Sequence, residues 1–252
     1  MGPDFENRRV LVTGAASGIG EATCRRFAEF GASVVAVDRD RDKVAEVAAS
    51  MPDAVAVVAD VADPAQVDKA FATVGTLDVV VHSAGIDDPV AKEEIAAAIE
   101  NATTPDLLTV LDDDRWRRMM AVNLDGTFHV LRAACRVMKP RGQGAIVVVG
   151  SATALDTPAA YGHYAASKAG VHALCQSAAK EAGPWGLRIN VVAPGLTNTG
   201  MGLRAPEAVR RTRQARAAEP VEIADIAVFL ASERAANVNG EVLLANGGLF
   251  TR

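Results

Sequence analysis

The chain has 252 residues, of which 50% are hydrophobic and 4% are aromatic, and its formal net charge is −5. This length accommodates one large α/β domain with a core of small branched side chains. The acidic balance gives no electrostatic footprint for nucleic acid or an anionic membrane surface, and no apolar run approaches the roughly 20 residues of a transmembrane helix.

The three cysteines are far apart in the sequence and have no metal-ligand spacing. We therefore expect buried thiols in a reducing compartment and no metal site. Residues 1–12 contain no apolar segment typical of a secretion signal, so a cytoplasmic location is expected.

In the first third of the chain, short apolar segments alternate with amphipathic ones. The periodicity predicts strands at 8–13, 33–38, 54–59 and 77–82, and helices at 19–30, 41–50 and 64–74. Strands that alternate with helices of this length indicate βαβ units and therefore a parallel sheet.

The second half continues this alternation without a linker or an internal repeat. A long helix is expected from Asp112 to Lys139, where Pro140 ends it. Further strands are predicted at 144–150, 187–193 and 241–245, and further helices at 161–182, 206–218 and 221–232. The predicted fold is a single α/β domain over residues 1–252: one doubly wound parallel sheet of Rossmann type, with about seven strands and helices on both faces.

A glycine-rich loop with Gly14, Gly18 and Gly20 lies between the first strand and the first helix. Glycines there allow backbone N–H groups to approach a pyrophosphate at the helix N-terminus, although such a loop alone is also compatible with a simple turn. Asp38 closes the second strand 18 residues after Gly20, where a carboxylate that binds a ribose is expected. Arg39 could face a 2′-phosphate, but with Asp38 beside it we favour NAD over NADP.

Tyr164 and Lys168 are one helical turn apart, or ~6 Å along the axis. A phenol has an unperturbed pKa of ~10, and a nearby ammonium favours the phenolate, so the pair can supply a general acid/base. The alternative is an interior tyrosine beside an exposed lysine. Tyr161 lies two turns from Lys168, too far to share its ammonium, and we expect it to line a substrate cleft.

These motifs resemble those of the short-chain dehydrogenase/reductase family, and the resemblance covers nearly the whole chain. It rests on the glycine loop, on Tyr164 and Lys168, and on further matches at the ends of the predicted strands and on the predicted long helix: Asp60-Val61, Ala84-Gly85, Asn123, Ser151, Pro194-Gly195 and Gly247-Gly248.

The resemblance implies a role for each matching position. Tyr164 would be the catalytic acid/base, Lys168 would hold the nicotinamide ribose and lower the pKa of the tyrosine, and Ser151 would bind the substrate oxygen. Asn123 would help to hold a water that links Lys168 to solvent. The implied cofactor-binding residues are Gly14, Ser17, Gly18, Ile19, Gly20, Asp38, Arg39, Asp60, Val61, His82, Ala84, Gly85, Tyr164, Lys168, Pro194, Gly195, Thr197 and Thr199.

Two positions depart from the family pattern. His82-Ser83 stands where two asparagines are usual, and we expect a ring nitrogen or the backbone of His82 to reach the adenine ribose. Asn246 stands where an acidic residue is common, which we interpret as structural.

The substrate side is less determined. Residues of about 87–111 form an apparent insertion with a helical piece, Lys92 to Asn101, which would serve as a lid or as an oligomer contact. The substrate-loop segment, about 196–218, is rich in arginine. Arg204 or Arg210 could bind an anionic substrate, or the run could be a solvated helix face, which charge runs more often are.

The resulting prediction is an NAD(H)-dependent oxidoreductase that interconverts a small secondary alcohol and a ketone. An NADPH-dependent 3-oxoacyl thioester reductase is the alternative within the same class, and a non-catalytic dinucleotide-binding sensor is the alternative outside it. By resemblance, the two long helices would pair across a subunit interface in a homo-oligomer, either a tetramer or a dimer.

Overall fold

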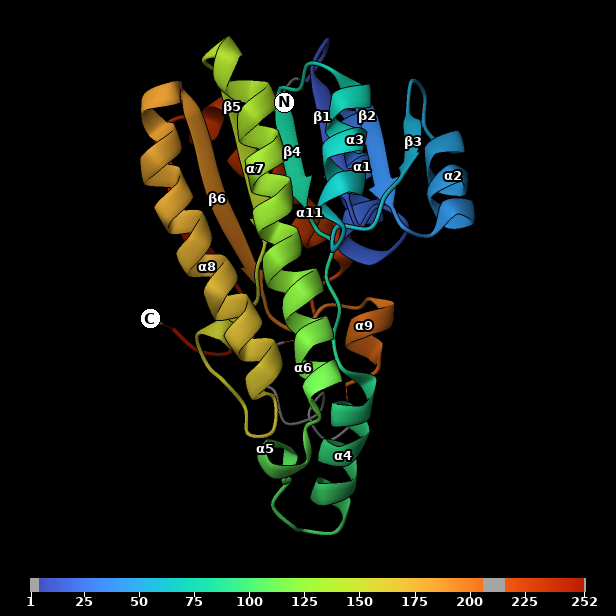
Figure 1. Cartoon of the computed structure of the whole chain (residues 1–252), viewed down its shortest axis with the longest axis vertical. Helices are drawn as coiled ribbons and strands as arrows, with labels where there is room; N and C mark the ends of the chain where they lie inside the picture. The colour runs from blue at the N-terminus through green and yellow to red at the C-terminus, as the bar shows by residue number, and fades with distance from the viewer. Residues whose placement is uncertain (1–4, 206–215, 252) are drawn as a thin grey trace.

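The structure, a computed structural model, describes residues 5–205 and 216–251. These residues contain a seven-stranded sheet with the strand order β3-β2-β1-β4-β5-β6-β7, in which every neighbouring pair is parallel (Figure 1). The predicted doubly wound α/β fold is therefore confirmed. The strands are β1 (Arg9–Thr13), β2 (Ser33–Asp38), β3 (Val55–Val58), β4 (Val79–His82), β5 (Gly144–Val149), β6 (Leu187–Pro194) and β7 (Val242–Ala245).

Helices cover both faces of the sheet. The described helices are α1 (Gly18–Glu29), α2 (Arg41–Ala49), α3 (Pro64–Val74), α4 (Pro89–Glu100), α5 (Leu107–Val110), α6 (Asp113–Met120), α7 (Gly126–Met138), α8 (Gly162–Ala182), α9 (Gly200–Leu203) and α11 (Pro220–Ala231). None of these helices is long and apolar enough to cross a membrane.

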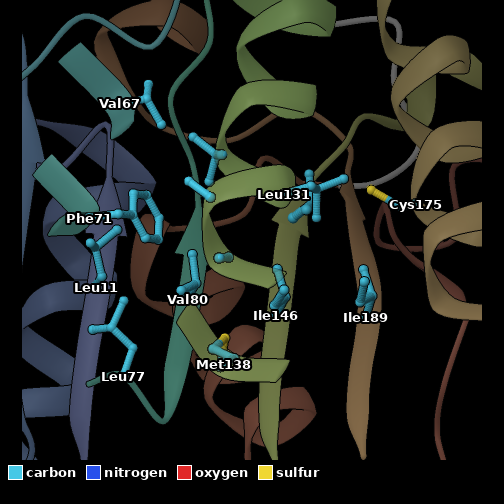
Figure 2. Packing of buried hydrophobic residues seen from close by; sticks show 14 of the residues in the cluster. Leu11, Val67, Phe71, Leu77, Val80, Leu131, Met138, Ile146, Cys175 and Ile189 are labelled. Atoms are coloured by element: carbon cyan, nitrogen blue, oxygen red, sulfur yellow. The ribbon is translucent and has the colours of Figure 1, made fainter. Parts of the chain in front are cut away.

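The two faces of the sheet bury separate hydrophobic clusters. Side chains alternate along a strand, so Leu11 of β1 packs on one face while Val10 and Val12 pack on the other. Figure 2 shows the first cluster, in which Leu11 and Phe71 meet across the space between sheet and helices. Burial on both faces explains why these strands are nearly continuous runs of apolar residues.

The helix predicted at 112–139 is interrupted. It consists of α6 and α7 joined by a π-helical segment, Ala121–Asp125, which contains Asn123. A π-turn inserts one extra residue into the helix, and hydropathy periodicity does not reveal it. Most of the helix predicted at 206–218 lies outside the described residues, and the short helix α9, which we did not predict, precedes it.

The insertion begins with α4 at the carboxyl-terminal edge of the sheet, where α9 also lies (Figure 1). Asp88 caps α4 by accepting a hydrogen bond from the Ala91 N–H, and Pro89 fills the first helical position. Both features are typical of a helix start. The helix therefore starts three residues before the predicted Lys92.

Candidate active site

A cavity of about 1020 Å³ lies at the carboxyl ends of the strands, the edge where open α/β sheets bind ligands. It extends from the glycine loop after β1 to the insertion and α9. The predicted site residues that line it are Gly14, Ser17, Gly18, Ile19, Asp38, Arg39, Asp60, Val61, Ala84, Gly85, Ser151, Tyr164, Lys168, Pro194, Gly195, Thr197 and Thr199. The other three, Gly20, His82 and Asn123, lie behind its wall.

The glycine loop is tightly packed where it turns from β1 into α1. Gly14 has a φ of +70°, and a Cβ there would lie 2.6 Å from the Ala84 nitrogen. A Cβ on Gly20 would lie 2.0 Å from the Gly14 carbonyl oxygen. Both positions therefore require glycine.

Asp38 is held in a fixed position at the end of β2. Its two carboxylate oxygens accept hydrogen bonds from the Ala16 N–H at 3.1 Å and the Asp40 N–H at 3.0 Å. Arg39, beside it, is exposed and also lines the cleft. A glycine cradle at a helix N-terminus with a fixed carboxylate beyond it fits the phosphates and ribose of a dinucleotide.

Tyr164 and Ser151 meet at the floor of the cleft, where they are 9% and 7% exposed. Burial raises the pKa of Tyr164 to about 12, while a hydrogen bond with Ser151 lowers it and the charge of Asp87 raises it further. Two hydroxyls that converge in this way can bind one substrate oxygen.

Lys168 lines the cleft, and its ammonium is bonded to the end of β5. Its ammonium donates a hydrogen bond to the Val149 carbonyl oxygen at 3.0 Å, at the end of β5. Burial is the largest influence on the pKa of Tyr164, and the lowering of that pKa by Lys168 stays a prediction. Burial also lowers the pKa of Lys168 to about 8.

Asn123 fixes the main chain that leads into the insertion. Its side-chain oxygen accepts from the Ile86 N–H at 2.8 Å, and its amide donates to the Ile86 carbonyl at 3.0 Å and to Ser167 Oγ at 3.1 Å. Gly85 separates Asn123 from Lys168, because a Cβ at Gly85 would lie 3.3 Å from the Asn123 oxygen and 3.4 Å from the Lys168 nitrogen. The water predicted to link this site to solvent stays a prediction.

The ring of His82 does not make the contact expected of it, while the contact of its backbone with an adenine ribose stays a prediction. Its ring is 1% exposed, and its nitrogens pair with Thr13 Oγ1 at 2.7 Å and Thr127 Oγ1 at 3.1 Å. Neither nitrogen is therefore available to an adenine ribose. The ring instead ties the ends of β1 and β4 to α7, and burial lowers its pKa to about 3.

Sequence reasoning missed the ionic groups at the substrate end of the cleft. Asp87 pairs with Lys92 and Arg204, and Asp88 pairs with Arg115 at 2.8 Å and His163 at 3.0 Å. The only sequence signal was Asp88-Pro89 as a possible helix start. Arg204 is thus already paired with a carboxylate, and Arg210 lies outside the described residues.

Tyr161 lines the cleft, as expected from its spacing. It precedes α8, and its ring lies against the Tyr164 ring with centroids 4.9 Å apart. The aromatic pair forms one wall of the cleft beside the Tyr164 hydroxyl. Leu249 and Phe250, from the C-terminal segment, line the cleft as well, and no sequence pattern indicated them.

The family model described as short chain dehydrogenase matches residues 8–209. The chain is 39% identical to a galactitol 2-dehydrogenase (L-tagatose-forming) of Cereibacter sphaeroides, over 94% of this chain and 92% of that protein. It is also 39% identical to a cis-4-hydroxycyclohexanecarboxylate dehydrogenase of Sinomonas cyclohexanicum, over 98% of each. A solved short-chain type dehydrogenase/reductase from Mycobacterium ulcerans superposes with a TM-score of 0.86 at 30% identity, over 98% of this chain and 90% of that one.

The chain belongs to the short-chain dehydrogenase/reductase family. It is accordingly an oxidoreductase that acts on CH–OH groups with a nicotinamide dinucleotide as cofactor and a small molecule as substrate. The glycine loop, Asp38 and Lys168 are the parts of the cleft whose chemistry fits that cofactor.

Proposed function

We propose that this enzyme interconverts a secondary alcohol and a ketone with NAD(H), and that Tyr164 is the acid/base. The observation that carries the proposal is the hydrogen-bonded pair of Tyr164 and Ser151, buried in the same cleft as the glycine loop and Asp38. A binding protein has no physical need for two converging hydroxyls at that depth.

When bound, the nicotinamide supplies or accepts the hydride. The remaining work belongs to residues of this chain. In the oxidative direction, Tyr164 as phenolate accepts the proton of the substrate hydroxyl, while Ser151 donates a hydrogen bond to the same oxygen. Lys168 would hold the nicotinamide ribose, and Asn123 fixes the main chain at Ile86, which lines the cleft.

The preference for NAD over NADP rests on Asp38. Its carboxylate is held by two backbone N–H groups and cannot turn away easily, so it would lie against a 2′-phosphate. Like charges brought together in this way cost several kcal/mol, so we expect NADH to bind at least about 100-fold more tightly than NADPH. In Asp38→Ser the ratio should fall below about tenfold, because Arg39 remains. Equal affinities in the wild type would favour the NADPH-dependent thioester reductase.

A panel of secondary alcohols with NAD⁺, followed by NADH absorbance, tests the reaction. The two dehydrogenases at 39% identity make polyols and cyclic hydroxy acids the first compounds to try, with steroids and hydroxyacyl thioesters after them. Binding of NADH without turnover of any alcohol or ketone would favour the dinucleotide sensor. The cytoplasmic location and the homo-oligomer stay predictions.

A further inference from the structure

Three segments meet at the substrate end of the cleft through one buried carboxylate. The Asp87 side chain, 4% exposed, accepts a hydrogen bond from the Lys92 ammonium of α4 and another, at 2.9 Å, from the guanidinium of Arg204, the residue after α9. Lys92 donates a further hydrogen bond, at 2.7 Å, to the Met201 carbonyl oxygen in α9. We call Asp87, Lys92 and Arg204 the clasp.

We propose that Asp87 is a positioning residue for the substrate: through Lys92 and Arg204 it holds α9 against the insertion and so sets the width of the substrate end of the cleft. This inference rests on the proposed function only where substrate kinetics are concerned.

The clasp matters because α9 itself makes few other contacts, although the residues just before it are paired with Ala218. This helix has four residues, and none of them is buried. Its N-terminus is capped by Thr199, whose hydroxyl accepts from the Gly202 N–H at 3.0 Å, but that contact is internal to the segment. Apolar packing therefore contributes little to its placement. The links that cross from the insertion to α9 are the Arg204–Asp87 ion pair and the hydrogen bond from Lys92 to the Met201 carbonyl oxygen, and Asp87 orients Lys92 for the second.

The buried position of Asp87 makes this link stronger than an exposed ion pair. Lys92 is 12% exposed, whereas Arg204 is 48% exposed, so the carboxylate and the ammonium are largely removed from water. Exposed pairs contribute little to stability, but removing one partner from a buried, hydrogen-bonded pair is strongly destabilising. We therefore expect Lys92 to contribute more than Arg204 to the placement of α9.

The segment around Asp87, to which α9 is attached, is itself held in place. Asp88, the next residue, pairs with Arg115 of α6 and with His163 of α8, and the Tyr161 hydroxyl bonds to the Asp88 backbone. The charged and titratable groups around Asp87 are thus Lys92, Arg204, Asp88, Tyr161 and Tyr164. Movement of α9 would change the cleft next to Tyr161 and Tyr164, where the substrate reacts.

The test is hydrogen exchange of the backbone amides of residues 200–205 in the free protein, compared between wild type and Asp87→Asn. Asparagine keeps the shape of the side chain but removes the charge that holds both cations. We expect exchange at 200–205 to become at least about tenfold faster, while exchange in α7 stays unchanged. Glu93→Gln, on the exposed side of α4, is the matched control and should alter neither.

Kinetics supply the second readout. For whichever alcohol the panel identifies, Asp87→Asn should raise KM about tenfold or more and change kcat less, with NADH affinity unaltered. Arg204→Gln, at a half-exposed position, keeps the test available if Asp87→Asn does not fold. It should show a smaller change in the same direction, and the double variant should show less than the sum of the two effects.

Unchanged exchange at 200–205 in folded Asp87→Asn or Arg204→Gln would overturn the clasp, and so would additive effects in the double variant. The exchange measurement needs no turnover. If no alcohol is oxidised, the proposed function fails while the clasp is still decided by exchange.

Discussion

The two ends of the cleft are built in different ways. At the nucleotide end, the wall is largely backbone and small residues, with the loop after β1 packed against Ala84 and the Ala16 N–H bonded to Asp38, 22 residues away. At the substrate end, the wall is made of ion pairs that join distant segments, such as Arg204 with Asp87, 117 residues apart. One end depends on the local conformation of a loop, and the other depends on how α4, α6, α8 and α9 come together.

Among the changes that compare the two ends, the largest effect is expected at the nucleotide end. In Gly20→Ala, the new Cβ would lie 2.0 Å from the Gly14 carbonyl oxygen, so the loop must move. Such a shift costs typically 1–3 kcal/mol or more, and we expect NADH affinity to fall at least about tenfold in a fluorescence titration. Gly162→Ala is the control, because a Cβ there meets nothing within 4 Å. Equal affinities in the two variants would show that the nucleotide end does not depend on the tight loop.

The wall behind the nucleotide end should be sensitive to pH. Burial lowers the pKa of His82 to about 3, whereas an unfolded histidine has a pKa of ~6.5, so the neutral ring favours the folded state. This contribution is fully present above pH ~6.5 and is lost as the pH falls toward 3.

His82→Asn removes this pH dependence together with the two ring hydrogen bonds. At neutral pH the variant should be less stable than wild type by about 1–3 kcal/mol. Between pH ~6.5 and ~4.5 that gap should narrow by about 2 kcal/mol. Only in the wild type does unfolding expose an imidazole that takes up a proton in this pH range, so acid favours the unfolded state of the wild type alone. Denaturant unfolding at several pH values measures the gap, and a gap independent of pH would argue against a buried neutral histidine.

The smallest effect is expected at the tip of the insertion. Leu108 is 95% exposed, whereas Lys92 of the same insertion lines the cleft. Because we propose that the insertion serves the cleft and not a subunit contact, Leu108→Ser should change stability by less than about 0.5 kcal/mol. Oligomeric state, measured by light scattering, should stay the same. Dissociation in this variant would show that the insertion is an oligomer contact.

The nucleotide end of the cleft was more predictable from the sequence than the substrate end. The strands, the glycine loop and the Tyr164–Lys168 pair were predictable because each is a local pattern. The residues that form it are a few positions apart in the sequence, and the period of a strand or helix fixes how they lie. The pairing of Asp87 with Arg204 depends on tertiary packing, and no spacing indicates it. The π-turn around Asn123 and the hydrogen bonds of the His82 ring with two threonines also depend on tertiary packing, and no sequence pattern indicated them. Lys168 was expected to act on Tyr164, but the direction of its ammonium toward Val149 is set by the end of β5.

The central claim is that Tyr164 carries the proton of the reaction. Tyr164→Phe keeps the ring and its contact with Tyr161 but removes the hydroxyl that meets Ser151. Turnover of the best alcohol in the panel should fall by at least about 10³-fold, given the usual contribution of acid–base catalysis, while NADH affinity measured by titration stays within about twofold of wild type. Substantial remaining turnover with intact NADH binding would contradict the account, since the proton would then leave by another group.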